Sequence, residues 1–276
     1  MAAFETGTQE LLCTVEDGVA VVMLNRPQAR NSLSDELTPA LRRTLAALVN
    51  EPAARVVMLT GAGEAFCSGG NVKDMGSGQP SSLDHAAKVA RLIDRQRTLT
   101  GLLVNYPKPT LAALPGAAAG AGLALALACD MRIAAQSVFV TTGYARIALS
   151  GDYGIAWLLD RLVGPSRAAE LMYFSERIPA ARCEAIGLVN WVVPDDEFRK
   201  TAMEKARLIA QGPPSAFARM KDNLRFAASA DFLTALDHEA ENMVRSAGTA
   251  EHREAVRAFV EKRAPRFDAA GRSVQR

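Results

Sequence analysis

The sequence has few of the side chains that enzymes most often use for acid–base, nucleophilic or metal chemistry. Only three of its 276 residues are histidines, His85, His238 and His252, and all three lie in charged helical segments typical of solvent-exposed positions. The four cysteines lie far apart and form no C-x-x-C pair. This spacing argues against a zinc site and indicates reduced thiols, as in a cytoplasmic protein.

A strong excess of charge of one sign is also missing. The formal net charge is only +2, which argues against a broad nucleic-acid or membrane-binding surface, although a few local cations can still hold an anionic ligand. The first ten residues, MAAFETGTQE, contain acids and no apolar core, so we expect no signal peptide. We therefore expect a cytoplasmic protein with neither nucleic acid nor membrane as a partner.

One charge-free run, residues 109–129, is long enough in principle to span a bilayer. Pro115 and Gly116 divide it, however, and alanine rather than leucine supplies its bulk. We interpret the run as a buried strand at 110–114, a turn, and a buried helix that begins near Gly120.

The hydrophobic content of 49% is typical of a globular protein. Two β-rich runs flank Asp17-Gly18, which indicates a hairpin, and Ser34 is the expected N-cap of the helix that follows. The first two thirds of the chain alternate strands, such as 55–61, with helices, such as 83–104. The rest is helical. We predict an α/β core over residues 1–198 and a C-terminal helical region over 199–276 that contributes to oligomer contacts.

The glycine-rich stretches do not fit the common nucleotide-binding or hydrolase motifs. In GAGEAF (61–66), Phe66 stands where G-x-G-x-x-G needs its third glycine, and no Walker lysine follows. The serine-hydrolase pattern G-x-S-x-G fails at Ser68, where Phe66 replaces the first glycine, and at Ser150, where Ala148 does.

The remaining possibility is that peptide N–H groups of the glycine-rich stretches, rather than side chains, bind the reacting group. AFCSGGN (65–71) and PGAAAGAGLALALACD (115–130) each follow a predicted strand, and a helix is expected to begin near Ala121. The first turn of a helix has free N–H groups and a positive dipole end. Two peptide N–H groups directed at one oxygen form an oxyanion hole. The alternative is close helix–strand packing, which also requires small residues.

Five stretches carry a resemblance to a known family: NRPQARNSL (25–33), GAGEAFCSGGNVKDM (61–75), LPGAAAGAGLALALACDMRIA (114–134), GLVNWVVP (187–194) and FVEKRAPRF (259–267). In this order and spacing, the chain resembles the crotonase, or enoyl-CoA hydratase/isomerase, superfamily over nearly its whole length. The resemblance implies a spiral of ββα units with C-terminal helices that trimerise, often as a dimer of trimers. It also implies an acyl-CoA substrate and no cofactor beyond the coenzyme A portion of that substrate.

By position, the resemblance places the two oxyanion donors at Gly70 and Ala121. Lys73 and Lys262 match positions that contact the phosphates of the coenzyme, and the alternative is that both are solvated surface lysines. The remaining positions along the coenzyme path, which act mostly through their backbone, are Arg26, Ala29, Ala65, Ser68 and Asn71. Asn71 stands where the family commonly has aspartate.

The chain departs from the family at the catalytic acids. The two glutamates with which hydratases hold and activate water correspond to Ala124 and Tyr144. Asp152 occupies a position where some isomerase and dehalogenase members carry a functional aspartate. Its alternative role is the N-cap of the next helix, and Tyr144 either supplies a hydroxyl or packs its ring. An apolar neighbourhood is expected to raise the pKa of Asp152, namely Ile147, Leu149, Ile155 and Trp157.

Three functions follow from this pattern. The first is an enoyl-CoA isomerase that uses Asp152 as its base. The second is a hydratase, or another thioester reaction such as hydrolysis, with unusual catalytic groups. The third is an acyl-CoA-binding protein with little activity. The missing glutamates favour the first over the second, and the two intact glycine-rich segments count against the third.

Overall fold

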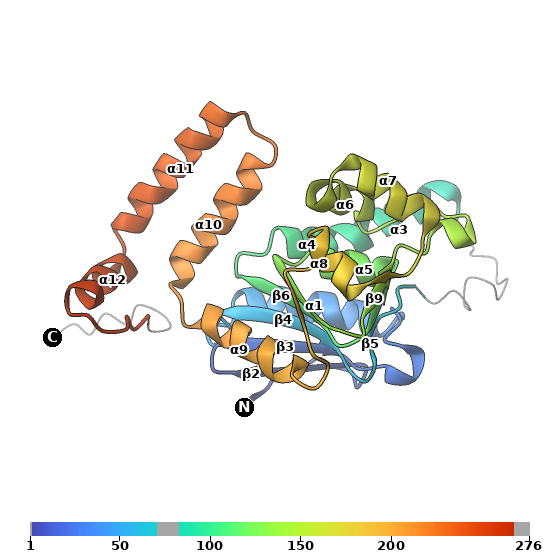
Figure 1. Cartoon of the computed structure of the whole chain (residues 1–276), viewed down its shortest axis with the longest axis horizontal. Coiled ribbons are helices and arrows are strands. Elements are labelled where there is room, and N and C mark those ends of the chain that lie inside the picture. Colours follow the sequence, from blue (N-terminus) through green and yellow to red (C-terminus); the bar gives the residue numbers. More distant parts are fainter. Residues whose placement is uncertain (1, 71–82, 268–276) are drawn as a thin grey trace.

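A computed structural model describes residues 2–70 and 83–267 of the chain (Figure 1). Its larger sheet has seven strands in the order β1 (Ala2–Ala3), β2 (Leu11–Glu16), β3 (Val19–Leu24), β4 (Val56–Gly61), β6 (Thr110–Leu114), β8 (Met131–Ala135) and β11 (Trp191–Val193). β1, β2 and β3 pair antiparallel, and every pairing from β3 to β11 is parallel. Asp17 and Gly18 both have positive φ, which confirms the predicted tight hairpin between β2 and β3.

A smaller sheet has four strands in the order β10 (Ile178–Pro179), β9 (Phe139–Thr141), β7 (Ala117–Ala119) and β5 (Ala65–Cys67). The chain alternates between the two sheets, because β4, β6 and β8 lie in the larger one and their successors β5, β7 and β9 lie in the smaller one. Each repeat therefore adds one strand to each sheet, as the predicted spiral of ββα units requires. The prediction of a simple turn after β6 is wrong, because Ala117–Ala119 forms a strand there.

The helices of the core are α1 (Leu37–Val49), α3 (His85–Arg97), α4 (Thr100–Val104), α5 (Ala121–Leu127), α6 (Ile155–Val163), α7 (Pro165–Phe174), α8 (Ala180–Ala185) and α9 (Phe198–Ala210), with short 3₁₀ turns η1 (Pro27–Ala29) and η2 (Ala145–Ile147). The Ser34 hydroxyl accepts the Leu37 N–H at 2.9 Å and so caps α1 as predicted. The predicted helix 83–104 is interrupted before Thr100. All seven residues of α5 are buried.

The last three helices, α10 (Pro214–Ala227), α11 (Phe232–Ala247) and α12 (Ala250–Val260), extend away from the two sheets (Figure 1). Large apolar side chains on them are exposed, among them Leu224, Phe232 and Phe259. By contrast, α9 begins at the predicted boundary near residue 198 and packs on the larger sheet, with Phe198 buried. None of the helices in the described residues is long and apolar enough to cross a membrane.

Candidate active site

The loop after β5 meets the start of α5. Gly69 has φ +84°, and a Cβ atom at this residue would lie 2.7 Å from the Ala119 carbonyl oxygen and 3.3 Å from the Ala121 nitrogen. The Gly69 carbonyl in turn accepts the Leu33 N–H at 2.8 Å, which holds the loop in place. Only glycine fits this conformation and this approach. The two predicted oxyanion residues, Gly70 and Ala121, therefore lie on neighbouring backbone segments.

The first turn of α5 presents backbone donors without side chains in front of them. Gly120 precedes the helix with φ +52°, and its carbonyl accepts the first helical bond, from the Ala124 N–H at 3.0 Å. The N–H groups of Ala121, Gly122 and Leu123 therefore have no acceptor within the helix. No side chain caps this end, and no acid lies in the first turn. These donors can stabilise negative charge that develops on a ligand oxygen.

Close packing explains other glycines of the same segment. A Cβ atom at Gly122 would lie 2.3 Å from the Cys67 carbonyl oxygen, and one at Gly116 would lie 1.9 Å from the Glu64 carbonyl oxygen. Both glycines let β5 and its preceding turn press against the β7–α5 segment. The packing interpretation therefore holds for Gly116 and Gly122, and it places the Cys67–Gly70 backbone beside α5.

The residues of the expected coenzyme path are joined by hydrogen bonds. The Ser68 N–H donates to the Arg30 carbonyl at 3.0 Å, and its hydroxyl donates to the Ala29 carbonyl at 3.4 Å. The fully buried Asn31 amide donates to the Ala65 carbonyl at 2.7 Å and to the Ala62 carbonyl at 2.9 Å. Asn31 was not singled out from the sequence. Its only signal was its place in the stretch NRPQARNSL.

Arg26 lies beside this path, and its side chain makes contacts with other residues of the same chain. Its Nε lies 2.8 Å from Glu10 Oε1, and its Nη1 donates to the Ser32 carbonyl at 2.7 Å. Its backbone N–H donates to the Asn31 side chain at 2.8 Å. The Arg26 guanidinium thus links Ser32, after the η1 turn, to Glu10, directly before β2.

Of the three remaining coenzyme positions, only Lys262 belongs to the part of the chain that the structure describes. Asn71 and Lys73 lie outside the described residues. Lys262 is exposed just beyond α12, which Figure 1 places at the opposite side of the molecule from β5 and α5. Within a single chain, Lys262 therefore does not join Gly70 and Ala121.

Tyr144 and Asp152 form a pair next to the start of α5. The Tyr144 hydroxyl donates to Asp152 Oδ1 at 2.6 Å. A Cβ atom at Gly120 would lie 3.8 Å from that hydroxyl oxygen, which places the pair beside the oxyanion segment. α6 begins only at Ile155, and Gly154 is its N-cap with no side-chain bond. The interpretation of Asp152 as a helix cap is therefore wrong, because its carboxylate accepts the Tyr144 hydroxyl instead.

Burial raises the pKa of Asp152 above its usual range, and the Tyr144 hydrogen bond acts in the opposite direction. Burial also raises the pKa of Tyr144, so its hydroxyl stays protonated and able to donate. The apolar residues predicted to surround Asp152 account for only part of the burial that raises its pKa. Ile155 is buried, but Ile147, Leu149 and Trp157 are 43%, 49% and 46% exposed.

The two positions of the missing glutamates have different surroundings. Ala124 is fully buried on α5 and offers only a methyl group. Tyr144 is 6% exposed and supplies a hydroxyl, so its polar role is observed rather than simple ring packing. With one carboxylate, one phenol and backbone donors, the site is equipped for proton transfer next to a polarised carbonyl.

The sequence of the chain matches the profile of the enoyl-CoA hydratase/isomerase family over residues 14–270. It is 38% identical to a Rhodobacter capsulatus protein named "Probable enoyl-CoA hydratase", over 92% of this chain and 95% of that protein. It is 33% identical to the 1,2-epoxyphenylacetyl-CoA isomerase of Escherichia coli, over 93% of this chain and 97% of that protein.

Solved structures agree with these relationships. A crystal structure of enoyl-CoA hydratase from Bacillus anthracis superposes with a TM-score of 0.88 at 33% identity, and covers 95% of this chain and 100% of that one. The enoyl-CoA hydratase from Polaromonas sp. JS666 superposes with a TM-score of 0.87 at 34% identity, and covers 94% of this chain and 99% of that one.

Successive strands that alternate between two sheets around a spiral, together with the solved structures that superpose on it, identify this chain as a crotonase-fold enzyme. The chain belongs to the enoyl-CoA hydratase/isomerase family.

Proposed function

We propose that the protein shifts the double bond of an enoyl-CoA, with Asp152 as the base. The observation that carries this proposal is the partly buried Asp152–Tyr144 pair beside the first turn of α5.

In this reaction Asp152 removes a proton from C2 of a 3-enoyl thioester. The electron pair of the C–H bond delocalises onto the thioester oxygen, which the N–H groups of Gly70 and Ala121 hold. Each such donor contributes about 3–4 kcal/mol to the transition state. The carboxylic acid then returns the proton at C4, and the double bond moves to C2–C3. Tyr144 orients the carboxylate throughout.

Hydration is the second candidate, and the names of several relatives and structural neighbours favour it. The family uses two carboxylates to orient water, and here Ala124 and Tyr144 replace them. The E. coli relative is named as an isomerase of an epoxide thioester, 1,2-epoxyphenylacetyl-CoA, so its name favours isomerisation of an acyl-CoA over hydration without pointing to a double-bond shift. Thioester hydrolysis and binding of acyl-CoA without turnover are the further alternatives.

The coenzyme and the assembly belong to the same proposal. We expect Lys73 of one subunit and Lys262 of a neighbouring one to contact the coenzyme phosphates, and the exposed apolar side chains of α10–α12 to form a homotrimer or a dimer of trimers. A stable monomer by light scattering at micromolar concentration would contradict this assembly. The four cysteines are free thiols, which supports a cytoplasmic location.

The substitution Asp152→Asn tests the proposal. We expect the variant to fold and bind acyl-CoA, and to lose double-bond isomerisation by about 10²–10⁴-fold, the usual contribution of a general base. Asp160→Asn, on the exposed face of α6 in the same part of the chain, is the matched control and keeps full activity. If wild type hydrates a 2-enoyl-CoA rapidly and Asp152→Asn does so equally well, the hydratase assignment replaces this one.

A further inference from the structure

The loop that carries Asp152 has an unusual backbone. Between residues 148 and 154, φ is positive at Ala148 (56°), Gly151 (105°), Tyr153 (52°) and Gly154 (77°). Glycine adopts such values freely, whereas an aromatic residue such as Tyr153 does so only where its surroundings enforce them. The position of the Asp152 carboxylate therefore depends on whatever contacts hold Tyr153.

A side chain from another element provides such a contact. The Tyr153 N–H donates to the Gln96 side-chain oxygen Oε1 at 2.6 Å, although the two residues are 57 positions apart in sequence. Gln96 lies in the last turn of α3. Tyr153 as a whole is only 6% exposed, so it is held against the body of the protein.

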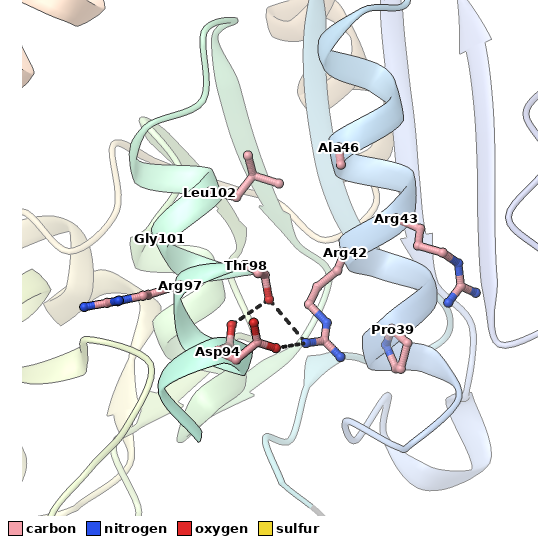
Figure 2. A pocket seen from close by; sticks show the side chains of 9 residues that line it. All are labelled: Pro39, Arg42, Arg43, Ala46, Asp94, Arg97, Thr98, Gly101 and Leu102. Atoms are coloured by element: carbon pink, nitrogen blue, oxygen red, sulfur yellow. Dashed lines mark hydrogen bonds and ion pairs between the residues drawn. The ribbon is translucent and has the colours of Figure 1, made fainter. Parts of the chain in front are cut away.

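Ion pairs and a hydrogen bond anchor α3 to α1. Figure 2 shows the Arg42 guanidinium of α1 pointing toward α3, where its Nη1 donates to Thr98 Oγ1 at 3.2 Å and lies 3.7 Å from Asp94 Oδ2. Arg95 Nη2 lies 3.0 Å from Asp35 Oδ1, just before α1. These contacts flank Gln96 on both sides, so its amide oxygen is presented from a fixed support.

Packing alone does not hold the loop on this side. A cavity of about 770 Å³ lies between α3–α4 and α6, and Gln96, Tyr153 and Gly154 line it together with apolar residues that include Ile93 and Trp157. The loop therefore has space next to it. Without the hydrogen bond from Tyr153, its backbone can relax toward the cavity and move Asp152 relative to the oxyanion donors.

We infer that Gln96 is a positioning residue for the reaction: its side-chain oxygen fixes the Tyr153 backbone and thereby sets the place of the Asp152 carboxylate beside the start of α5. The inference deepens the proposed function and rests on it for the role of Asp152. Because a positioning residue acts through the Asp152 loop, we expect Gln96 to affect turnover rather than binding.

Gln96→Met and Gln96→Glu separate this role from a purely structural one. Methionine keeps the length of the side chain and loses the acceptor, and glutamate keeps the acceptor. We expect Gln96→Met to lower the kcat of isomerisation by about 10- to 100-fold, as a displacement on the order of 1 Å does, with an unchanged KM. Gln136→Met makes the same replacement at an exposed position; it is the control, and we expect it to keep wild-type kcat.

Gln96→Glu is expected to recover kcat at alkaline pH. Its acidic limb moves to higher pH, because a second negative charge near Asp152 raises the pKa of that carboxyl. A wild-type kcat in Gln96→Met would overturn the inference. An equal loss in both variants, at every pH, would also overturn it.

Hydrogen exchange followed by mass spectrometry over residues 148–158 tests the contact independently of activity. Gln96→Met is expected to speed exchange in this segment, and Gln96→Glu is expected to leave it protected. Unchanged protection in Gln96→Met would refute the contact. If exchange behaves as expected but Asp152→Asn remains fully active, the proposed function fails while the contact between Gln96 and the loop stands.

Discussion

Gly122→Ala is the smallest change that tests whether packing between β5 and α5 sets the oxyanion geometry. The new methyl group would lie 2.3 Å from the Cys67 carbonyl oxygen and 2.7 Å from the Cys67 Cβ atom. An ordinary carbon–oxygen contact is about 3.3 Å or longer. The obstruction includes backbone, and Cys67 is fully buried, so a change of side-chain rotamer cannot relieve it.

The two segments must therefore separate by about 1 Å. Overpacking of this kind costs about 1–3 kcal/mol of folding free energy. The same displacement moves the loop through Gly69 and Gly70 away from Ala121, and a misplacement on the order of 1 Å at a reacting centre lowers turnover by about 10²-fold. We expect the loss of activity to exceed what partial unfolding at the assay temperature explains.

The measurements are thermal unfolding by calorimetry and steady-state turnover of an enoyl-CoA by wild type and variant. Gly248→Ala is the matched control, because its φ is ordinary and its added methyl group meets atoms no closer than 3.7 Å. The reasoning is refuted if Gly122→Ala melts and turns over like wild type. It is also refuted if stability falls while kcat of the folded enzyme is unchanged, since the packing then does not control the donors.

Two further substitutions test the Tyr144–Asp152 pair and the buried Asn31 side chain. In Tyr144→Phe the hydrogen bond that lowers the pKa of Asp152 is lost, so that pKa rises further. Because Asp152 must be ionised to act as a base, activity should then disappear at a higher pH as the solution is acidified; a limb that stays in place in the pH dependence of kcat/KM would contradict this. Asn31→Ala leaves the Ala62 and Ala65 carbonyls and the Arg26 N–H without their partner. Since an unsatisfied buried group costs about 1–3 kcal/mol, the urea midpoint should fall with an unchanged m-value, and a midpoint equal to that of wild type would refute the role assigned to this side chain.

Local signals in the sequence account for much of the larger sheet and its helices. The hairpin at Asp17-Gly18, the cap at Ser34 and the strand at 110–114 each depend on neighbouring residues, and the structure confirms all three. The start of α5 at Ala121 was also predictable, because Gly120 is the kind of residue that tolerates its φ of +52°.

The smaller sheet was not predictable in the same way. β7 consists of three alanines, which have little intrinsic preference for strands. It forms because β5 and β9 pair with it on either side, and both partners are distant in sequence. The absence of side chains is what permits the close approach at Gly116 and Gly122, so tertiary contact overrides local propensity here.

The environment of Asp152 depends on the same kind of distant contact. An aspartate three residues before a helix suggests a cap, and no local pattern shows that Tyr144 and Gln96 hold its loop instead. Two effects act on the carboxylate in opposite directions: burial raises its pKa, and the Tyr144 hydrogen bond limits the rise. A base that was simply exposed would be weaker, and one buried without Tyr144 would remain protonated to a higher pH. The tyrosine at a position where hydratases carry glutamate is therefore better understood as a partner of Asp152 than as a lost catalytic acid.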